Sequence, residues 1–313
     1  MSRELTLTDH STREAWLTSR SSGLGASDVA SLFTGPDGLP LGYSSPMKLW
    51  LEKTNQIPPE SLNDDLLDLG NKFEPVIAEM YAERTGRQIK QYGQYCVAQH
   101  ETIPYFRATP DRWVTAAPDR MGRGLVQIKK SNRFVRYQWD DGVPLAIQIQ
   151  TQAEMAVTGY DWDSVPRIYD LVSFETSDVE RDPAFILELE DRVRWFWDLV
   201  QSRTPPGMDG DKSTLEAIKR LHPHDNGETV RLPEEAVAWA DLLANATANV
   251  KTAEAAKRKA EAELRSAIGS ATFGELPDGR KFSLKTIERI AYTSNVAAAT
   301  FRTLRQVGGS SLP

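Results

Sequence analysis

A charged hairpin constrains this chain more than any other stretch of its sequence. Residues 109–114 read Thr-Pro-Asp-Arg-Trp-Val, and after a polar, glycine-containing turn residues 124–129 read Gly-Leu-Val-Gln-Ile-Lys. This pattern predicts two short strands joined by a turn. Because side chains alternate along a strand, Gln127 and Lys129 should project from one face, where Asp111 on the neighbouring strand can meet them.

The residue types in this hairpin fit one kind of chemistry. A carboxylate, a second oxygen ligand and a lysine on adjacent strands can hold Mg²⁺, orient a water and balance the charge of a phosphate group. An isolated Asp…Gln-x-Lys pattern also occurs in ordinary exposed hairpins, so the flanking segments decide between the two interpretations.

The pattern Asp111…Gln127-x-Lys129 resembles the PD-(D/E)XK nuclease core, and the flanking segments resemble the YqaJ-type viral recombinase nucleases related to phage lambda exonuclease. One departure is plain, because the second acid of that family is Gln127 here. The resemblance implies an α/β fold whose PD-(D/E)XK nuclease core is a central mixed sheet flanked by helices. A C-terminal long helix and β-hairpin extension would follow this core.

A first flanking motif lies near the N-terminus, where Trp16, Arg20 and the sequence Gly-Ala-Ser-Asp at 25–28 follow one another. From the residues alone, Arg20 is a surface arginine, and Ser27 or Asp28 caps a helix over 29–33, whose N-terminus would favour an anion. The resemblance implies that Arg20 and Ser27 bind the 5′ phosphate of the recessed DNA strand.

A second motif lies in a helix expected over 64–85, within which Gly70 is followed by Glu74 and Pro75. A glutamate on a helix is normally solvated, and Pro75 predicts a distortion close to it. The resemblance assigns Glu74 to the metal region as the helical catalytic glutamate.

A third motif, Gln-x-Gln-x-x-Met-x-Val-Thr-Gly, spans 150–159 in a helix expected from Pro144. Gln148 and Gln152 share a helical face. The resemblance implies that Gln152 is the active-site glutamine, which positions the attacking water or a phosphate oxygen. Gln150 is the weaker neighbour and is assigned to DNA contact.

A run of basic residues follows the hairpin turn and contains no acid between 120 and 139. Its members are Arg120, Arg123, Lys129, Lys130, Arg133 and Arg136. Such a run is either a solvated charged face or a phosphate-binding surface. Its place beside the hairpin favours DNA contact by Lys130, Arg133 and Arg136.

Composition limits the remaining possibilities. The 313 residues carry a net charge of −7, so any DNA-binding surface must be local. The single cysteine excludes a disulfide framework, a cysteine-ligated zinc site and an iron–sulfur cluster. The absence of a signal peptide or a long apolar run predicts a cytoplasmic protein, in a bacterium or a phage-infected host, without membrane contact.

The sequence divides into two parts. We expect an exonuclease core over 1–227, followed over 228–313 by a helical arm with a β-hairpin and a mobile tail. Residues 234–268 are rich in Ala, Glu and Lys with apolar residues at helical spacing, and Pro277, Asp278 and Gly279 predict the hairpin turn.

The resulting hypothesis is a metal-dependent deoxyribonuclease, a 5′-to-3′ exonuclease that exposes a 3′ single strand for phage-type recombination. Mg²⁺, with Mn²⁺ able to substitute, would be held by Asp111, Gln127 and Glu74. The resemblance further implies double-stranded DNA ends as substrate, a single-strand annealing protein as partner and a homo-oligomeric ring. Because Gln127 is neutral, a catalytically weak or inactive DNA-end-binding protein is the alternative. A structural phage protein that assembles through 234–290 is a third, less supported one.

Overall fold

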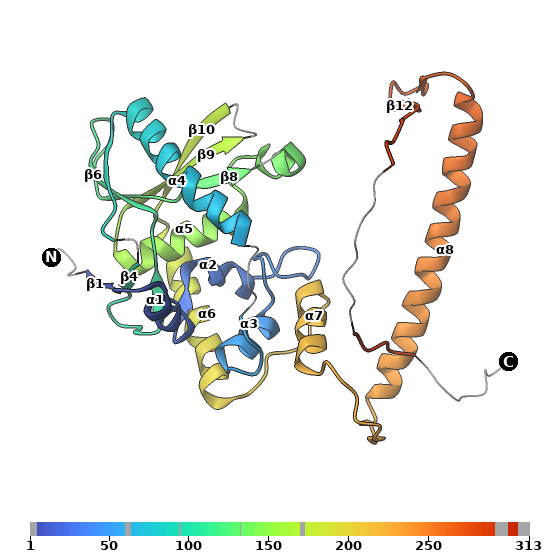
Figure 1. Ribbon diagram of the computed structural model, residues 1–313, viewed down its shortest axis with the longest axis horizontal. Coiled ribbons are helices and arrows are strands. Elements are labelled where there is room, and N and C mark those ends of the chain that lie inside the picture. The colour runs from blue at the N-terminus through green and yellow to red at the C-terminus, as the bar shows by residue number, and fades with distance from the viewer. Residues whose placement is uncertain are drawn as a thin grey trace. The chain divides into compact units, whose positions relative to one another are not determined.

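A computed structural model describes residues 5–59, 64–93, 95–131, 133–169, 173–291 and 300–305 of the chain. The chain divides into two compact units, Met1–Pro223 and His224–Pro313 (Figure 1). The sequence-based boundary was placed at 227. Of the expected C-terminal tail, residues 292–299 and 306–313 lie outside the described residues.

A six-stranded mixed sheet forms the first layer of the N-terminal unit. Its order is β10-β9-β7-β6-β3, and β8 also pairs with β9. The strands are β3 (Gln88–Lys90), β6 (Arg112–Ala116), β7 (Gly124–Val126), β8 (Lys129–Ser131), β9 (Trp162–Tyr169) and β10 (Ser173–Glu180). The hairpin of β6 and β7 is antiparallel, as predicted, whereas β7 and β8 both run parallel to β9. Strands β9 and β10 pair antiparallel, from Trp162 opposite Glu180 to Tyr169 opposite Ser173.

A smaller four-stranded sheet has the order β1-β4-β5-β2. Its strands are β1 (Thr6–Asp9), β2 (Leu24–Gly25), β4 (Cys96–Gln99) and β5 (Phe106–Ala108). Strand β1 pairs with β4, from Thr6 opposite Gln99 to Asp9 opposite Cys96.

The helices of the N-terminal unit follow the local signals only in part. They are α1 (Arg13–Ser21), α2 (Ala26–Val29), the 3-10 helix η1 (Ala30–Leu32), α3 (Pro46–Lys53), α4 (Asp64–Thr85), the 3-10 helix η2 (Arg133–Trp139), α5 (Leu145–Thr158), α6 (Pro183–Ser202) and α7 (Lys212–Leu221). Thr12 accepts a capping bond from Ala15 at the start of α1, and Ser45 does so for Lys48 in α3. Asp211 caps α7 by accepting from Ser213 N, and α4 continues through Pro75.

Helix α5 is central to this unit. Every residue from Thr151 to Thr158 is buried, because α5 packs against β9 of the large sheet, against β4 and β5 of the small one and against α6 (Figure 1). It ends at Gly159, whose φ of 70° is the left-handed conformation that glycine adopts without strain. Helix α4 contacts the opposite face of β9, where the Tyr81 hydroxyl donates to Ser164 Oγ at 2.8 Å. Mixed sheets flanked by helices confirm the expected α/β class.

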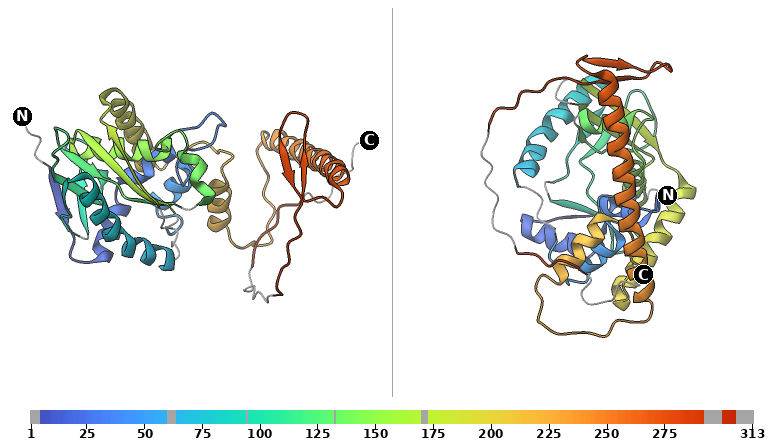
Figure 2. Two further views of the ribbon diagram at one scale, coloured as in Figure 1. Left: turned by 90° about the horizontal axis from the view of Figure 1, so that it is seen from above. Right: turned by 90° about the vertical axis from the view of Figure 1, so that its right-hand side faces the viewer.

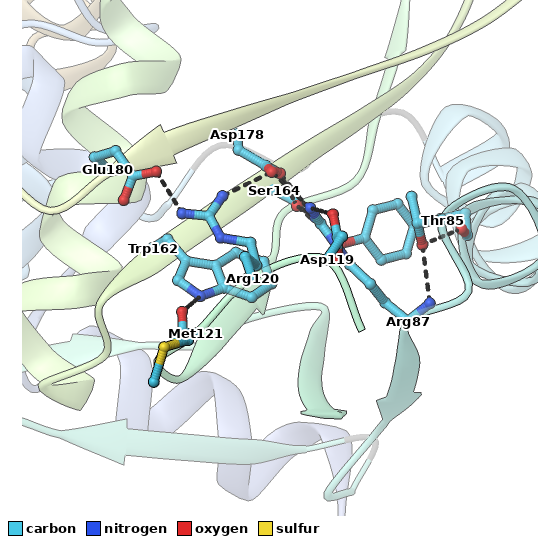
Figure 3. A network of polar contacts seen from close by, with 10 residues as sticks. Thr85, Arg87, Asp119, Arg120, Met121, Trp162, Ser164, Asp178 and Glu180 are labelled. Atoms are coloured by element: carbon cyan, nitrogen blue, oxygen red, sulfur yellow. Dashed lines mark hydrogen bonds and ion pairs between the residues drawn. The ribbon is translucent and has the colours of Figure 1, made fainter. Parts of the chain in front are cut away.

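On the α4 side, a polar network fixes the turn between β6 and β7 to β9 and β10 (Figure 3). Arg87 lies at its centre, with ion pairs of 2.6 Å to Asp119 and 2.7 Å to Asp178. Arg120 is 2.7 Å from the same Asp178 carboxylate, and its guanidinium lies 4.2 Å from the ring centroid of Trp162. Arg120 therefore serves the fold through these contacts.

The C-terminal unit consists of one long helix and a hairpin. Helix α8 (Ala236–Ile268) matches the predicted helix, and β11 (Phe273–Glu275) pairs antiparallel with β12 (Lys281–Ser283). Figure 2 shows this hairpin at the C-terminal end of α8, where Gly274 approaches Ile268. Across the described chain, α8 included, the helices all fall short of the length or apolarity that crossing a membrane requires.

Candidate active site

The centre of the site is the interruption between β7 and β8. The predicted continuous strand over 124–129 is broken at residues 127 and 128, and the Asp111 carboxylate occupies the break. Asp111 Oδ2 accepts hydrogen bonds from Ile128 N at 2.7 Å and from Gln127 Nε2 at 2.9 Å. The break thus frees a backbone amide for the carboxylate. The predicted meeting of Asp111 and Gln127 is confirmed.

A second chain of contacts connects this hairpin to α5. Lys129 Nζ donates to Gln150 Oε1 at 2.9 Å, and Gln150 Nε2 donates to Glu154 Oε1, also at 2.9 Å. Gln150 and Glu154 are one helical turn apart, so both point toward the same side of α5. The Gln150 amide therefore bridges the lysine of the motif and a buried carboxylate.

The assignment of Gln152 to the site is corrected by the structure. Gln152 Nε2 donates to the carbonyl of Glu180 at 2.6 Å, and Gln152 Oε1 accepts from Asp182 N at 2.9 Å. Both ends of its amide are therefore used at the start of α6. Two residues along a helix are about 200° apart, so when Gln150 faces Lys129, Gln152 must face away.

Two buried acids that the sequence reasoning missed stand beside Lys129. Glu154 is 1% exposed and Asp163, on β9, is 0% exposed. Burial, reinforced by repulsion from Asp111, raises the pKa of Glu154 to about 8. Burial and repulsion from Glu154 also raise the pKa of Asp163 well above its ordinary value. These two carboxyl groups lie within hydrogen-bonding reach of each other, so a proton or a cation is needed between them.

Asp111 experiences the same environment. Burial first, and then repulsion from Glu74, raise its pKa to about 7, although Lys129, the Ile128 amide and Arg112 oppose the shift. Glu74 therefore lies near the site, as the resemblance implied. Its carboxylate is bound by Arg112 at 2.5 Å, and Arg112 also donates to the Asp111 carbonyl at 2.6 Å. Glu74 is thus ion-paired with Arg112 in this structure, and its expected role in the metal region stays a prediction.

A cavity joins the expected 5′-phosphate residues to α5. It is lined by Arg20, Gly25, Ala26, Ser27, Val97, Arg107, Ala108, Thr109, Gln150 and Glu154. Arg20 Nη2 lies 3.5 Å from Ser27 Oγ, as their shared motif predicts. The capping role of Ser27 was wrong, because Gly25 is the N-cap and Asp28 Oδ2 accepts from Gly25 N at 3.2 Å. Ser27 lies inside the helix and is one of the residues that line the cavity.

Arg107 adds a cation to this cavity that the sequence reasoning missed. Its Nη1 donates to the hydroxyls of Ser19 at 3.1 Å and Ser22 at 3.0 Å, and to the Ser19 carbonyl. Burial lowers the pKa of its guanidinium. Arg107 and Arg20 both line the cavity. This pair makes the end near Ser27 suited to an anion, whereas the end near Glu154 is acidic.

The rest of the basic run is divided between surfaces. Lys130 lies over the Phe73 ring of α4 at 5.1 Å, on the face opposite Lys129, and Arg136 lies over Tyr169 at 5.1 Å. Arg123 donates to the Gly159 carbonyl at 2.8 Å and serves the fold. The side chain of Arg133 lies outside the described residues. Lys130 and Arg136 are exposed, so their contact with DNA stays a prediction.

The donor atoms of this site fit a hard cation. Four buried oxygens of this site have no hydrogen-bond partner among the described residues when the acids are ionised, namely Gln127 Oε1, Glu154 Oε2 and both carboxylate oxygens of Asp163. Within the described ranges, no three His, Cys, Asp or Glu side chains are grouped to hold a metal ion by themselves. Mg²⁺ commonly takes only one or two carboxylates and completes its shell with water and substrate phosphate, so this donor set suits it.

One signal could have identified each missed acid. Glu154 follows Gln150 by four residues, which places the two on one helical face. Asp163 is an acid within a strand whose residues from Trp162 to Ile168 are all buried, and a buried charge needs a partner. Nothing in the local sequence identifies Arg107, because its neighbours on α1 are brought there by the tertiary fold.

Comparison with known proteins gives a consistent picture. Residues 15–161 match the family model of the YqaJ-like viral recombinase domain. The uncharacterized protein YqaJ of Bacillus subtilis (strain 168) is 24% identical over 217 residues, which are 67% of this chain and 63% of that relative, less than two thirds of its length. An alkaline exonuclease from Laribacter hongkongensis has 26% identity and a TM-score of 0.49, covering 61% of this chain and 93% of that one. A phage-related exonuclease from Haemophilus somnus 129PT has 13% identity and a TM-score of 0.42, covering 58% and 96%.

Proposed function

We propose that this protein is a Mg²⁺-dependent exonuclease. The premise is that residues 15–161 match the family model of the YqaJ-like viral recombinase domain. It would shorten one strand of double-stranded DNA from the 5′ end and leave a 3′ single strand. The observation that carries the proposal is the cavity in which Arg20 and Ser27 face Gln150 and Glu154, beside the contact of Asp111 with Gln127.

The side chains support phosphodiester hydrolysis in separate roles. Asp111 and the Gln127 oxygen would hold Mg²⁺, which when bound supplies Lewis acidity to the phosphate and lowers the pKa of a water. Lys129, held in place by Gln150, brings a positive charge to the reacting phosphate, where negative charge develops. The protein provides these groups in a largely buried setting, where electrostatic effects are stronger than in water.

The other end of the cavity supports recognition of a DNA terminus. Arg20 and the Ser27 hydroxyl can donate to the oxygens of one phosphate, and Arg107 lies in the same cavity wall. A terminal 5′ phosphate bound there would fix the strand end relative to Lys129. This arrangement favours removal of nucleotides from the 5′ end over cleavage at internal positions.

The proposal is tested with a blunt-ended duplex that carries a fluorophore on one strand and a 5′ phosphate on either strand. In the presence of Mg²⁺ or Mn²⁺, the wild-type protein is expected to shorten the 5′-phosphorylated strand progressively and to leave a closed circular plasmid intact. Asp111→Asn should lower the rate by about 10²- to 10³-fold. An intact duplex with both metals, or shortening from the 3′ end, would contradict the proposal.

A second candidate function is favoured by one contact. The Gln127 nitrogen, not an anionic oxygen, faces Asp111 at 2.9 Å, which leaves position 127 without negative charge. A protein that binds 5′-phosphorylated DNA ends without cleaving them would need Arg20, Ser27 and Arg107 but not a complete metal site. Retention of labelled duplex in a mobility-shift assay, without digestion in Mg²⁺ or Mn²⁺, identifies this second function.

The ring and the annealing partner implied by the resemblance belong to the same proposal. A protein with a net charge of −7 can approach DNA if its positive groups line an enclosed path, and a homo-oligomeric ring would provide one. Light scattering of the full chain gives the subunit number. A monomer at the concentrations that support digestion would contradict the ring.

A further inference from the structure

We propose that Glu154 on α5 supplies the second carboxylate of the cation site, the acid that position 127 lacks in this chain. The inference rests on the proposed function, since it concerns the same site, and it assigns to Glu154 a role in binding Mg²⁺ or Mn²⁺. Three independent features of the described residues lead to it.

The first feature is the position of the Glu154 side chain. Its Oε1 accepts from Gln150 Nε2 at 2.9 Å, and the same Gln150 amide accepts from Lys129 Nζ at 2.9 Å. Glu154 is thus one bridging amide away from the lysine of the motif. It also lines the cavity together with Ser27 and Thr109, the latter two positions before Asp111. The carboxylate therefore faces the space in which a terminal nucleotide would lie.

The second feature is an unused oxygen. Glu154 is 1% exposed, and its Oε2 has no hydrogen-bond donor among the described residues. A buried carboxylate oxygen without a donor is costly, and a bound cation removes that cost. Gln150 occupies the other oxygen. Among the described residues the Asp163 carboxyl is the group within reach of Glu154, so when no proton lies between these two acids Oε2 is the atom left to bind a metal ion.

The third feature is the charge balance. Asp111, Glu154 and Asp163 lie close enough to one another to interact electrostatically, and Lys129 is a cation that acts on all three. Glu74 is instead ion-paired with Arg112. One lysine offsets only part of the negative charge that three acids can carry, so the group favours a bound cation.

The neutral residue at position 127 is consistent with a second carboxylate that comes from Glu154. Gln127 Nε2 lies 2.9 Å from Asp111 Oδ2, so a carboxylate placed there in the same conformation would face Asp111 at a repulsive distance. In this chain the amide relieves that repulsion, and the second negative charge is supplied from α5. Asp163 is not among the residues that line the cavity, so it would position Glu154 without binding the metal ion itself.

The experiment measures Mn²⁺ binding to the full chain without DNA, by the electron paramagnetic resonance signal of free Mn²⁺. The wild type is compared with Asp111→Asn, Glu154→Gln, Asp163→Asn and the exchange variant Glu154→Gln/Gln127→Glu, all checked for folding by circular dichroism. Glu154→Gln is expected to raise the Kd by at least about tenfold, since loss of a direct ligand should cost no less than loss of an outer-shell group. The exchange variant should recover most of that affinity, and Asp163→Asn should lose less.

Several outcomes overturn the inference. Glu154→Gln with wild-type affinity, while Asp111→Asn has lost binding, removes Glu154 from the site and leaves the proposed exonuclease standing. An equal loss in Asp163→Asn and Glu154→Gln shows a general charge effect in place of ligation. If Glu154→Gln does not fold, Glu154→Asp provides the test, because it keeps the charge but withdraws the carboxylate by one methylene and should still weaken binding. A wild type that neither binds Mn²⁺ nor digests DNA contradicts this inference and the proposed function together.

Discussion

The ammonium of Lys129 is held 2.9 Å from the side-chain oxygen of Gln150. This contact predicts that Gln150→Leu lowers the exonuclease rate by about tenfold or more, because Lys129 loses the group that orients it toward the phosphate. The free energy of unfolding should fall as well, because the buried Glu154 Oε1 loses its donor, so the rate is compared at a temperature where the variant is folded. Initial rates on 5′-phosphorylated duplex, together with urea denaturation, measure both effects.

The matched control is Gln152→Leu in the same helix. Its loss leaves the Glu180 carbonyl and the Asp182 amide without their partner at the start of α6, so it should reduce the free energy of unfolding by about 1–3 kcal/mol. At a temperature where the variant is folded, its rate should stay close to that of the wild type. The opposite pattern, a stable but inactive Gln152→Leu, would return Gln152 to the active site.

A second prediction concerns recognition of the strand end by Arg20. Because its guanidinium lies 3.5 Å from the Ser27 hydroxyl and lines the cavity, Arg20→Gln should reduce the preference for 5′-phosphorylated over 5′-hydroxyl duplex by about tenfold. Competition between the two duplexes in one reaction measures this ratio. Arg13→Gln, an exposed arginine on the same helix, is the control and should keep the wild-type preference. An unchanged preference in Arg20→Gln would separate Arg20 from the phosphate.

A third prediction follows from Asp178 in the Arg87 network. Burial opposes its ionisation, but hydrogen bonds from Arg87, Ser164 and Arg120 outweigh this effect and lower its pKa to about 2. The ordinary value is about 3.9, so ionised Asp178 contributes roughly 2 kcal/mol to the free energy of unfolding. That contribution is complete above about pH 4 and is lost as the pH falls toward 2.

Asp178→Asn should therefore be less stable than the wild type at pH 7, and the difference should shrink between about pH 4 and pH 2. Urea denaturation across this range measures the difference. Asp191→Asn is the control, because Asp191 is 80% exposed and its ion pair with Arg194 is solvated. A gap between wild type and Asp178→Asn that is the same at pH 7 and pH 2 would contradict the assignment.

A fourth prediction separates the C-terminal arm from the site. Deletion of the chain from Glu234 onward should leave Mn²⁺ affinity within about twofold of the full chain, since every site contact described lies in the N-terminal unit. The deletion should instead change the oligomeric mass or the capture of an annealing protein. A folded but metal-free truncated protein would show that the arm belongs to the site.

Local signals in the sequence were enough to predict the bounds of several helices and the hairpin of the site. The end of α5 at Gly159 and the start of α1 after Thr12 follow from capping chemistry, which depends on a few adjacent residues. The alternation that places Gln127 beside Asp111 is equally local. By contrast, β1 was missed because its ladder with β4 joins residues about ninety positions apart, a pairing that the local sequence does not specify.

The choice between Gln150 and Gln152 shows the limit for the site itself. Helical geometry requires the two side chains to point in opposite directions, but only the packing of α5 between two sheets determines which one meets Lys129. For the same reason the partnership of Glu154 with Asp163 could not be predicted. It depends on how α5 lies across β9, which no short sequence pattern records.

The Arg87 network also has a kinetic consequence. Arg87 is hydrogen-bonded to Asp178, which lies 91 positions further along the chain, so a long loop must close before that contact can form. We therefore expect the network to be absent from the folding transition state. Arg87→Met should then leave the refolding rate nearly unchanged and accelerate unfolding, so that this network determines how long a folded molecule persists rather than how fast it forms.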